Sequence, residues 1–218
     1  SDIIQAIAYA KEHGASIVNM SFGGTDNNQA LREAMEESGL FFVCAAGNSR
    51  LDLGKKPIYP AAFSLDNSIS VGALNEDMGL AYFSNYGDQA VDIAAWGRGI
   101  YGCFPGGTYG KLDGTSIAAG YVSAAAALAA ATDENIILKE RLKSTADRLS
   151  CLKGKIIEGN KLSFSGTVCD ISNKEMTEVV PEEDFDETEA LLTPTEEWEL
   201  FSSKHNVAIA AGSRHALA

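Results

Sequence analysis

The sequence has little positive charge. Its 17 Lys and Arg residues are outnumbered by 30 Asp and Glu residues, which gives a formal net charge of -13. Nucleic acids and anionic membrane surfaces attract proteins through an excess of Lys and Arg. We therefore expect no nucleic-acid partner and no basic membrane-binding patch.

Metal-binding cysteine spacing and long apolar runs are also lacking. The four cysteines include no C-x-x-C pair, which argues against a zinc cluster. No apolar run reaches the roughly 18 residues of a membrane span, and no leader-like segment precedes Asp2, so we expect no membrane span. With 45% hydrophobic and 22% charged residues, the composition is that of a globular protein with one substantial core.

Helical and apolar segments alternate in the first part of the chain. Apolar residues at helical spacing over 3–10 precede a predicted strand over 16–20, and a second predicted helix over 28–37 is closed by Gly39. The run 40–45 is apolar on both faces, which is typical of a central strand in a parallel sheet. We expect an α/β fold of three layers, with a mostly parallel sheet, helices on both faces and ligands at the carboxyl ends of the strands.

The second part holds short strand signals and a long Ala-rich segment. Strands are predicted around 69–71 and 91–94. An Ala-rich helix is predicted from Ser116 to about 131, and because it is apolar nearly all round we expect it to be buried in the core. A further helix is predicted over 134–149.

Composition changes sharply after Cys169. Residues 174–199 hold eleven acidic residues and one basic residue, so we interpret 169–199 as a solvated acidic linker. Residues 200–218 contain an Ala-Gly-x-x-His pattern that resembles the start of a β-propeller repeat of the regulator-of-chromosome-condensation type. The expected organisation is therefore a compact domain over 1–168, the linker, and the opening of a propeller repeat.

Two polar residues suggest acyl-transfer chemistry. Ser116 lies in a Gly-Thr-Ser-Ile-Ala motif over 114–118, and Asn48 ends an Ala-Ala-Gly-Asn motif over 45–48. A serine nucleophile needs a base, and its tetrahedral intermediate needs hydrogen-bond donors for the oxyanion. Taken alone, Ser116 also suits a helix N-cap and Asn48 a turn. The motif lacks the second glycine of a nucleophile elbow, which argues against an α/β-hydrolase.

The order, spacing and residue types from 17–24 through 45–48 to the serine motif resemble the subtilisin-like serine proteases. The resemblance implies that Ser116 is the nucleophile and that the Asn48 side chain and the Ser116 backbone N–H bind the oxyanion. It also implies polypeptide substrates. The substrate-binding residues it implies are the strand-pairing segment and one wall of the specificity pocket, namely Ser21, Phe22, Gly23, Ala46 and Gly47.

The other two members of the family's triad have no counterpart in this chain. The family carries an aspartate in Asp-x-Gly and a histidine in His-Gly-Thr-His, both N-terminal to the matching region. We therefore expect residues 1–168 to be the C-terminal portion of a catalytic domain, inactive without its missing N-terminal half. His13 lies at a helix end and is predicted to be structural, and His205 and His215 follow the serine, contrary to the family order.

The resemblance implies further features. The chemistry needs no cofactor. Asp92, with backbone carbonyls near Tyr59 and Ala61, resembles a weak structural calcium site of some relatives. A single carboxylate supports such a site poorly. Ile58 implies a pocket for small or medium apolar side chains, and family habit favours an extracytoplasmic location. Two alternatives stay open: a pseudoprotease or scaffold that binds a protein partner, and a site completed by a separate chain.

Overall fold

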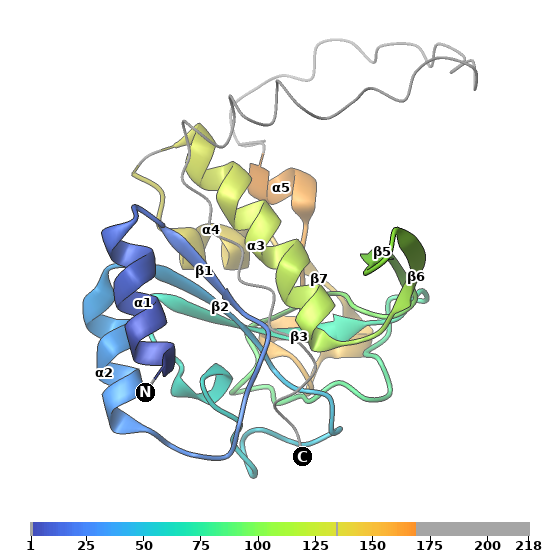
Figure 1. Cartoon of the computed structure of the whole chain (residues 1–218). Coiled ribbons are helices and arrows are strands. Elements are labelled where there is room, and N and C mark those ends of the chain that lie inside the picture. The colour runs from blue at the N-terminus through green and yellow to red at the C-terminus, as the bar shows by residue number, and fades with distance from the viewer. Residues whose placement is uncertain (1, 134, 169–218) are drawn as a thin grey trace.

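The computed structural model describes residues 2–133 and 135–168, so the predicted linker and propeller repeat lie outside the described residues. A six-stranded sheet forms the middle layer, in the order β1-β2-β3-β4-β8-β7 (Figure 1). Neighbouring strands are parallel except for the antiparallel pair β7 and β8. The strands are β1 Ile17–Met20, β2 Phe41–Ala45, β3 Ser68–Leu74, β4 Ile93–Trp96, β7 Asp147–Arg148 and β8 Asn160–Lys161.

Helices cover both faces of this sheet, as the sequence predicts. One buried cluster joins α1 and α2 to one face, and another joins α3 and α4 to the opposite face. The helices are α1 Asp2–Glu12, α2 Gln29–Ser38, α3 Thr115–Thr132, α4 Leu138–Ser144 and α5 Phe164–Val168, with short 3-10 turns at η1 Ala61–Phe63, η2 Ser150–Leu152 and η3 Ile157–Gly159. The three-layer α/β fold is therefore confirmed.

Strand β2 shows why the apolar runs become central strands. Phe42 and Cys44 belong to the cluster with α1 and α2, whereas Val43 and Ala45 belong to the cluster with α3. Successive side chains of a strand point to opposite faces, so a strand buried on both faces needs apolar residues at every position. All five residues of β2 are buried.

Local signals also set the ends of α2. The Asn28 side chain accepts a hydrogen bond from the Leu31 N–H at 2.9 Å, which satisfies one of the free donors of the first turn. Gly39 follows the last turn with φ 75°, in the left-handed conformation that glycine adopts without strain. The predicted boundaries over 28–37 are confirmed to within about one residue.

The predicted helix over 134–149 is wrong in extent. Helix α4 spans Leu138–Ser144, and the chain then forms β7. The Asn135 N–H donates to Asp133 Oδ1 at 3.0 Å, and Ile137 has an extended backbone with φ -87° and ψ 95°. This side-chain turn competes with the helix, so the helix begins only after Ile137.

Helix α3 is only partly buried. Ala118, Val122, Ala125 and Ala129 have no exposed surface, whereas Tyr121 retains 36% exposure on the other side of the helix. The expectation of burial all round is therefore wrong for one face. Among the described residues α3 is long and apolar enough to cross a membrane by length and composition, and its packing on the sheet is typical of a core helix.

A second sheet was not predicted. Strands β5 Ile100–Phe104 and β6 Thr108–Leu112 form an antiparallel hairpin that stands beside the first turn of α3 (Figure 1). The side chains of Tyr101 and Tyr109 in this hairpin are 71% and 70% exposed. The hairpin leads directly into Asp113 and Gly114, and so it delivers the chain to the serine motif.

Candidate active site

Three segments meet at the carboxyl edge of the parallel sheet. β1 ends just before Ser21, β2 ends just before the Ala46–Asn48 loop, and α3 begins at Thr115. Carboxyl ends of parallel strands lie at one edge of a sheet, which is where ligands bind in open α/β folds. The sequence-predicted residues Ser21, Asn48 and Ser116 are thereby brought together.

Ser116 is the second residue of α3 and is partly buried. Its Oγ donates to the Ser21 carbonyl at 3.2 Å, and Ser21 Oγ donates to the Ser116 carbonyl at 3.0 Å. This reciprocal pair joins the first turn of α3 to the end of β1. The Ser116 hydroxyl thus donates its hydrogen bond to a carbonyl oxygen and not to a base.

The Asn48 amide has a defined orientation. Its Oδ1 accepts from the Thr115 N–H at 2.8 Å and from the Thr115 hydroxyl at 2.9 Å. A backbone N–H can only donate, so Oδ1 must face Thr115, and Nδ2 is then left on the side of Gly114, 3.6 Å from where a Cβ on that glycine would lie. The Asn48 side chain is exposed, and among the described residues Nδ2 has no hydrogen-bond partner, which leaves a donor near the start of α3.

The first turn of α3 supplies a second donor. The N–H groups of Ile117 and Ala118 both point to the Gly114 carbonyl, at 3.1 and 3.3 Å. No described residue accepts the Ser116 N–H. Unpaired N–H groups at a helix start carry partial positive charge and favour an anion. Together with Asn48 Nδ2, this N–H can stabilise an oxyanion formed next to Ser116 Oγ.

Two residues that the sequence analysis missed hold the Asn48 loop. The buried Asn85 donates from Nδ2 to the Ala46 carbonyl at 2.7 Å, and its Oδ1 accepts from the N–H groups of Ser49 and Leu51 at 3.0 and 2.8 Å. Thr115 Oγ1 accepts from the Gly47 N–H at 3.0 Å. Asn85 and Thr115 both stand in polar, glycine-containing segments, so the sequence carried no signal that marks them, and their partners lie far apart in sequence.

Gly47 and Gly23 border a space occupied by Ile58. A Cβ on Gly23 would lie 2.8 Å from Ile58 Cγ2, and one on Gly47, whose φ is 100°, would lie 3.9 Å from that atom and 2.5 Å from Asn85 Nδ2. Both glycines are therefore required by close contacts. The partly buried Phe22 side chain packs against the cluster of α1 and α2.

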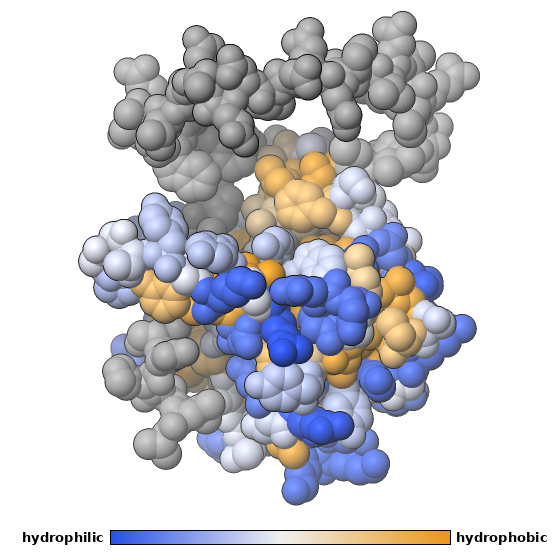
Figure 2. Space-filling view, turned by 90° about the vertical axis from the view of Figure 1, so that its right-hand side faces the viewer, coloured by the Kyte–Doolittle hydropathy of each residue, from blue (hydrophilic) through white to orange (hydrophobic). Residues whose placement is uncertain are grey.

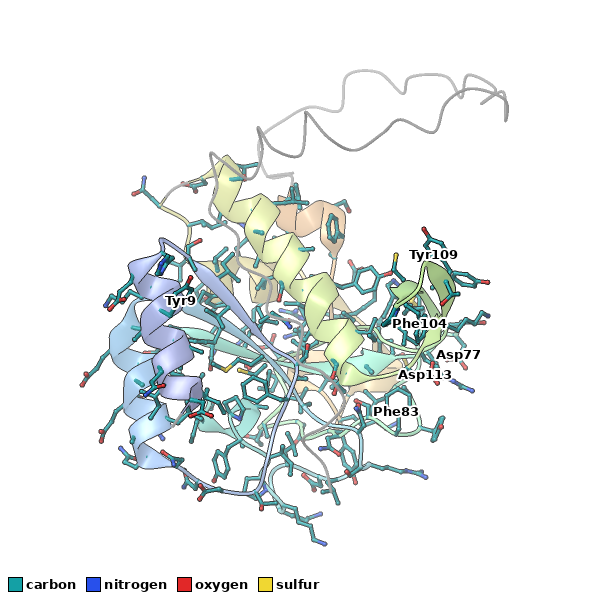
Figure 3. All side chains as sticks on the ribbon, viewed as in Figure 1. Tyr9, Asp77, Phe83, Phe104, Tyr109 and Asp113 are labelled. Carbon is teal, nitrogen blue, oxygen red and sulfur yellow. The ribbon has the colours of Figure 1, made fainter. Side chains whose placement is uncertain are left out.

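His13 lies far from this arrangement in the fold. Its ring stacks on Tyr9 with centroids 3.8 Å apart, and Nδ1 lies 2.8 Å from the Tyr9 carbonyl. Figure 3 shows Tyr9 on α1, across the molecule from Asp113 and the hairpin. The structural role predicted for His13 agrees with these contacts, and His205 and His215 lie outside the described residues. The described part of the chain therefore brings no histidine base to Ser116.

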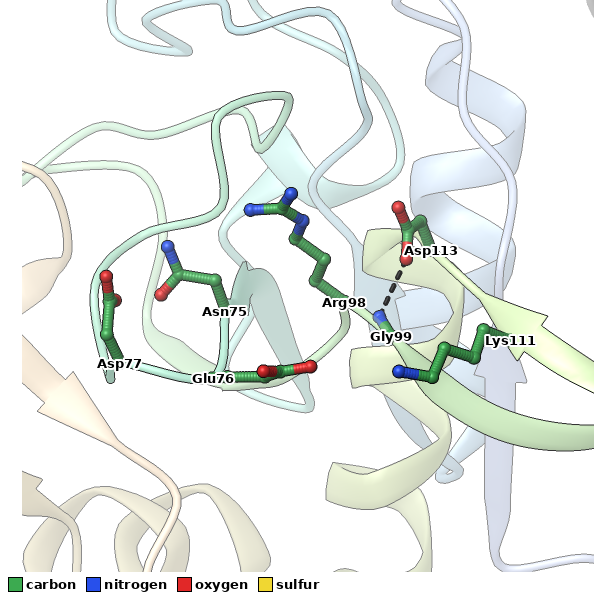
Figure 4. A pocket seen from close by; sticks show the side chains of 7 residues that line it. All are labelled: Asn75, Glu76, Asp77, Arg98, Gly99, Lys111 and Asp113. Atoms are coloured by element: carbon green, nitrogen blue, oxygen red, sulfur yellow. Dashed lines mark hydrogen bonds between the residues drawn. The ribbon is translucent and has the colours of Figure 1, made fainter.

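A polar hollow of about 560 Å³ lies beside the turn that precedes the serine (Figure 4). Asp113 Oδ1 accepts from the Gly99 N–H at 2.7 Å, which fixes this turn against the loop after β4. The hollow does not include Ser116 or Asn48. Its lining residues are Asn75, Glu76, Asp77, Arg98, Gly99, Lys111 and Asp113.

The predicted calcium site gains no support from the contacts of Asp92. Its Oδ2 accepts from both the N–H and the hydroxyl of Ser70, at 2.9 and 2.8 Å, and the Tyr59 carbonyl accepts from the Gly24 N–H at 2.8 Å. Within residues 2–133 and 135–168, no three His, Cys, Asp or Glu side chains gather where they could hold a metal ion. Structural calcium stays a prediction.

Comparison with known proteins places this geometry in context. A model of the subtilase family matches residues 1–163. Subtilisin DY of Bacillus licheniformis is 36% identical over 156 residues, which cover 68% of this chain and 56% of that protein. Thermitase of Thermoactinomyces vulgaris is 35% identical over 152 residues, covering 68% and 52%. The chain thus spans about half the length of these relatives.

Solved structures share the fold. The prenylagaramide maturation protease PagA has a TM-score of 0.66 at 27% identity, with 77% of this chain and 65% of that chain covered. A protease of Pseudoalteromonas arctica has a TM-score of 0.68 at 24% identity, with 77% and 57% covered. Both contain residues beyond those matched here.

Proposed function

The chain belongs to the subtilase family, and on that premise we propose that residues 1–168 carry the nucleophile and the oxyanion donors of a subtilisin-type serine endopeptidase. The orientation of Asn48 carries this proposal. Thr115 holds Oδ1 by two hydrogen bonds, so Nδ2 stays free beside the unpaired Ser116 N–H. An ordinary turn asparagine has no need of such an anchor.

In the proposed reaction, Ser116 Oγ attacks the carbonyl carbon of a peptide bond while a base takes its proton. The carbonyl oxygen becomes an oxyanion held by Asn48 Nδ2 and the Ser116 N–H. The amine leaves with a proton from the base, and water then hydrolyses the acyl ester on Ser116. Donors fixed before the reaction stabilise this charge without reorganisation.

The base and its carboxylate partner would come from a polypeptide segment other than the described residues. Among the described residues, β1 is the first strand of the sheet and pairs only with β2, so none of them covers its other edge. Removal of the triad histidine from subtilisin costs about 10⁶ in turnover. Residues 1–218 alone should accordingly be inactive.

The substrates would be polypeptides with a small or medium apolar side chain before the cleaved bond. The support is the position of Ile58, whose Cγ2 reaches into the space between Gly23 and Gly47. A large aromatic side chain would collide with it. Cleavage of a peptide library should favour Ala, Val or Leu at this position, and a preference for Phe, Tyr or Arg would refute the assignment. An extracytoplasmic location belongs to the same proposal.

Fluorophosphonate labelling tests the central claim. The reagent should modify Ser116 in the full product of the chain's gene, called the joined protein below, and not when residues 1–218 are used alone. Ser116→Ala in the joined protein is the control for labelling elsewhere. Absence of labelling in a folded joined protein that lacks the Asp-x-Gly and His-Gly-Thr-His motifs would favour the alternative of a scaffold that binds protein partners.

A further inference from the structure

We propose that Ser123 and Asn19 are positioning residues that, through Ser21, fix the first turn of α3 and hence the place of Ser116. The inference rests on the proposed function, because positioning matters only if Ser116 reacts. Ser123 lies seven residues after Ser116, which is two turns along the same helix face. Both Asn19 and Ser123 are 5% exposed, so their polar atoms need partners inside the protein.

The contacts form one continuous chain. Ser123 Oγ donates to Asn19 Oδ1 at 2.9 Å, and Asn19 Nδ2 donates to Ser21 Oγ at 2.8 Å. Ser21 Oγ then donates to the Ser116 carbonyl at 3.0 Å, while Ser116 Oγ donates to the Ser21 carbonyl at 3.2 Å. Two points on α3, separated by two turns, are thus tied to the end of β1.

The direction of this chain follows from its last member. A carbonyl oxygen can only accept, so the single proton of Ser21 Oγ must point to Ser116. Ser21 Oγ must then accept from Asn19, which requires Nδ2 on that side and Oδ1 towards Ser123. The Ser123 hydroxyl is left with one role, that of donor. A relay with a single allowed direction has one arrangement, and this holds the nucleophile's turn in one place.

Asn19→Asp is the sharpest variant, because it preserves shape and removes the donor. A carboxylate at this position accepts from Ser123 and also draws the Ser21 proton, so the Ser116 carbonyl faces an oxygen lone pair. We expect kcat to fall about 10-fold to 100-fold with KM unchanged, the scale of a misplacement of about 1 Å at a reacting group.

Ser123→Thr and Ser123→Val form a pair of equal shape that differs in the hydroxyl. Thr should keep most of the rate, and Val should lose it with KM unchanged. Ser38→Ala is the control for simple loss of a buried hydroxyl, because Ser38 is 7% exposed and its hydroxyl bonds only to the backbone of Met35 and Leu40, around the end of α2. Equal rates for Thr and Val, or an equal loss of kcat in Ser38→Ala, would overturn the proposal.

Hydrogen exchange separates this inference from the proposed function. In residues 1–218 alone, NMR should show protected side-chain amide protons on Asn19, with faster exchange in Ser123→Val and not in Ser123→Thr or Ser38→Ala. This readout needs no reaction at Ser116. If the joined protein is not labelled at all, the proposed function fails. The hydrogen-bond chain is then judged only by whether protection of the Asn19 side-chain amide protons depends on the Ser123 hydroxyl.

Discussion

At the scale of single residues, burial decides the reactivity of the cysteines. Desolvation by complete burial, followed by the negative charge of Asp92, raises the pKa of the Cys44 thiol from 9.0 to about 12. The thiolate is the reactive form, so Cys44 stays protonated and inert at neutral pH. Cys103 and Cys151 are exposed.

Iodoacetamide at pH 8 should therefore alkylate Cys103 and Cys151 in the folded chain and leave Cys44 unmodified. Mass spectrometry of the peptides gives the extent at each site. In denaturant Cys44 should react as fast as the other two, which serves as the control. Rapid native modification of Cys44 would mean that β2 is not buried as described.

The Asn48 side chain is expected to act on the transition state alone. In the joined protein, Asn48→Ala should lower kcat about 10²–10³-fold, the loss found when one oxyanion donor is removed from subtilisin, with KM nearly unchanged. Asn48→Asp keeps Oδ1 against Thr115 and loses the donor, so it should be at least as impaired. Steady-state kinetics on a peptide substrate measures both.

A higher KM with an unchanged kcat would assign Asn48 to substrate binding. A loss confined to Asn48→Ala, with normal turnover in Asn48→Asp, would mean that the anchor to Thr115 matters and the Nδ2 donor does not.

The sequence named candidate residues, and the structure supplies their arrangement. Local motifs together with the family resemblance named Ser116 and Asn48 as candidates, but the orientation of the Asn48 amide depends on Thr115, 67 positions away. The role of Asn19 depends on Ser123, 104 positions away. Contacts at such separations are set by the packing of α3 on the sheet, which periodicity alone does not specify.

At the scale of elements, capping gives α2 a measurable share of the stability. The Asn28 side chain bonds the Leu31 N–H, whereas the exposed neighbour Asn27 has no recorded hydrogen bond. Asn28→Ala should lower the free energy of unfolding by about 1 kcal/mol. Asn27→Ala is the matched control and should change it little. Urea denaturation of residues 1–218 measures both, and equal effects would contradict the capping role.

Elements with a strong local signal were predicted well, and elements set by tertiary context were not. Apolar runs fixed β1 and β2, and Asn28 with Gly39 marked the ends of α2. The β5–β6 hairpin was missed because Gly102 and Gly110 interrupt the alternation of apolar and polar residues along its strands. The two strands pair with each other, from Ile100↔Leu112 to Phe104↔Thr108. The start of α4 was misplaced because of the turn at Asp133.

At the scale of the whole molecule, the apolar surface is uneven. α3 is buried on the side that faces the sheet, while Tyr121 and Ala124 are exposed, and the apolar hollow next to Tyr121 is lined by Trp96, Leu162 and Phe164 as well. Figure 2 shows several separate hydrophobic areas between hydrophilic ones on the face that carries the hairpin. An open strand edge and an exposed apolar helix face both promote association with another polypeptide.

Residues 1–218 alone should therefore self-associate, and a charge on α3 should reduce this. Ala124→Glu places a carboxylate on the exposed face, where it is solvated in the monomer and desolvated in any complex that covers the helix. Sedimentation velocity should show a larger monomer fraction than in the unchanged chain. Ala30→Glu puts the same charge on an exposed position of α2 and should leave association unaltered.

The same pair of variants relates association to function. If the segment that completes the site covers α3, Ala124→Glu should weaken fluorophosphonate labelling of the joined protein and Ala30→Glu should not. Residues 1–218 could instead prove monomeric and unfold cooperatively, with Ala124→Glu changing neither the monomer fraction nor the labelling. That result would show that no other polypeptide needs to cover this face of α3. The open edge of β1 would then be the only described feature left to receive the missing base.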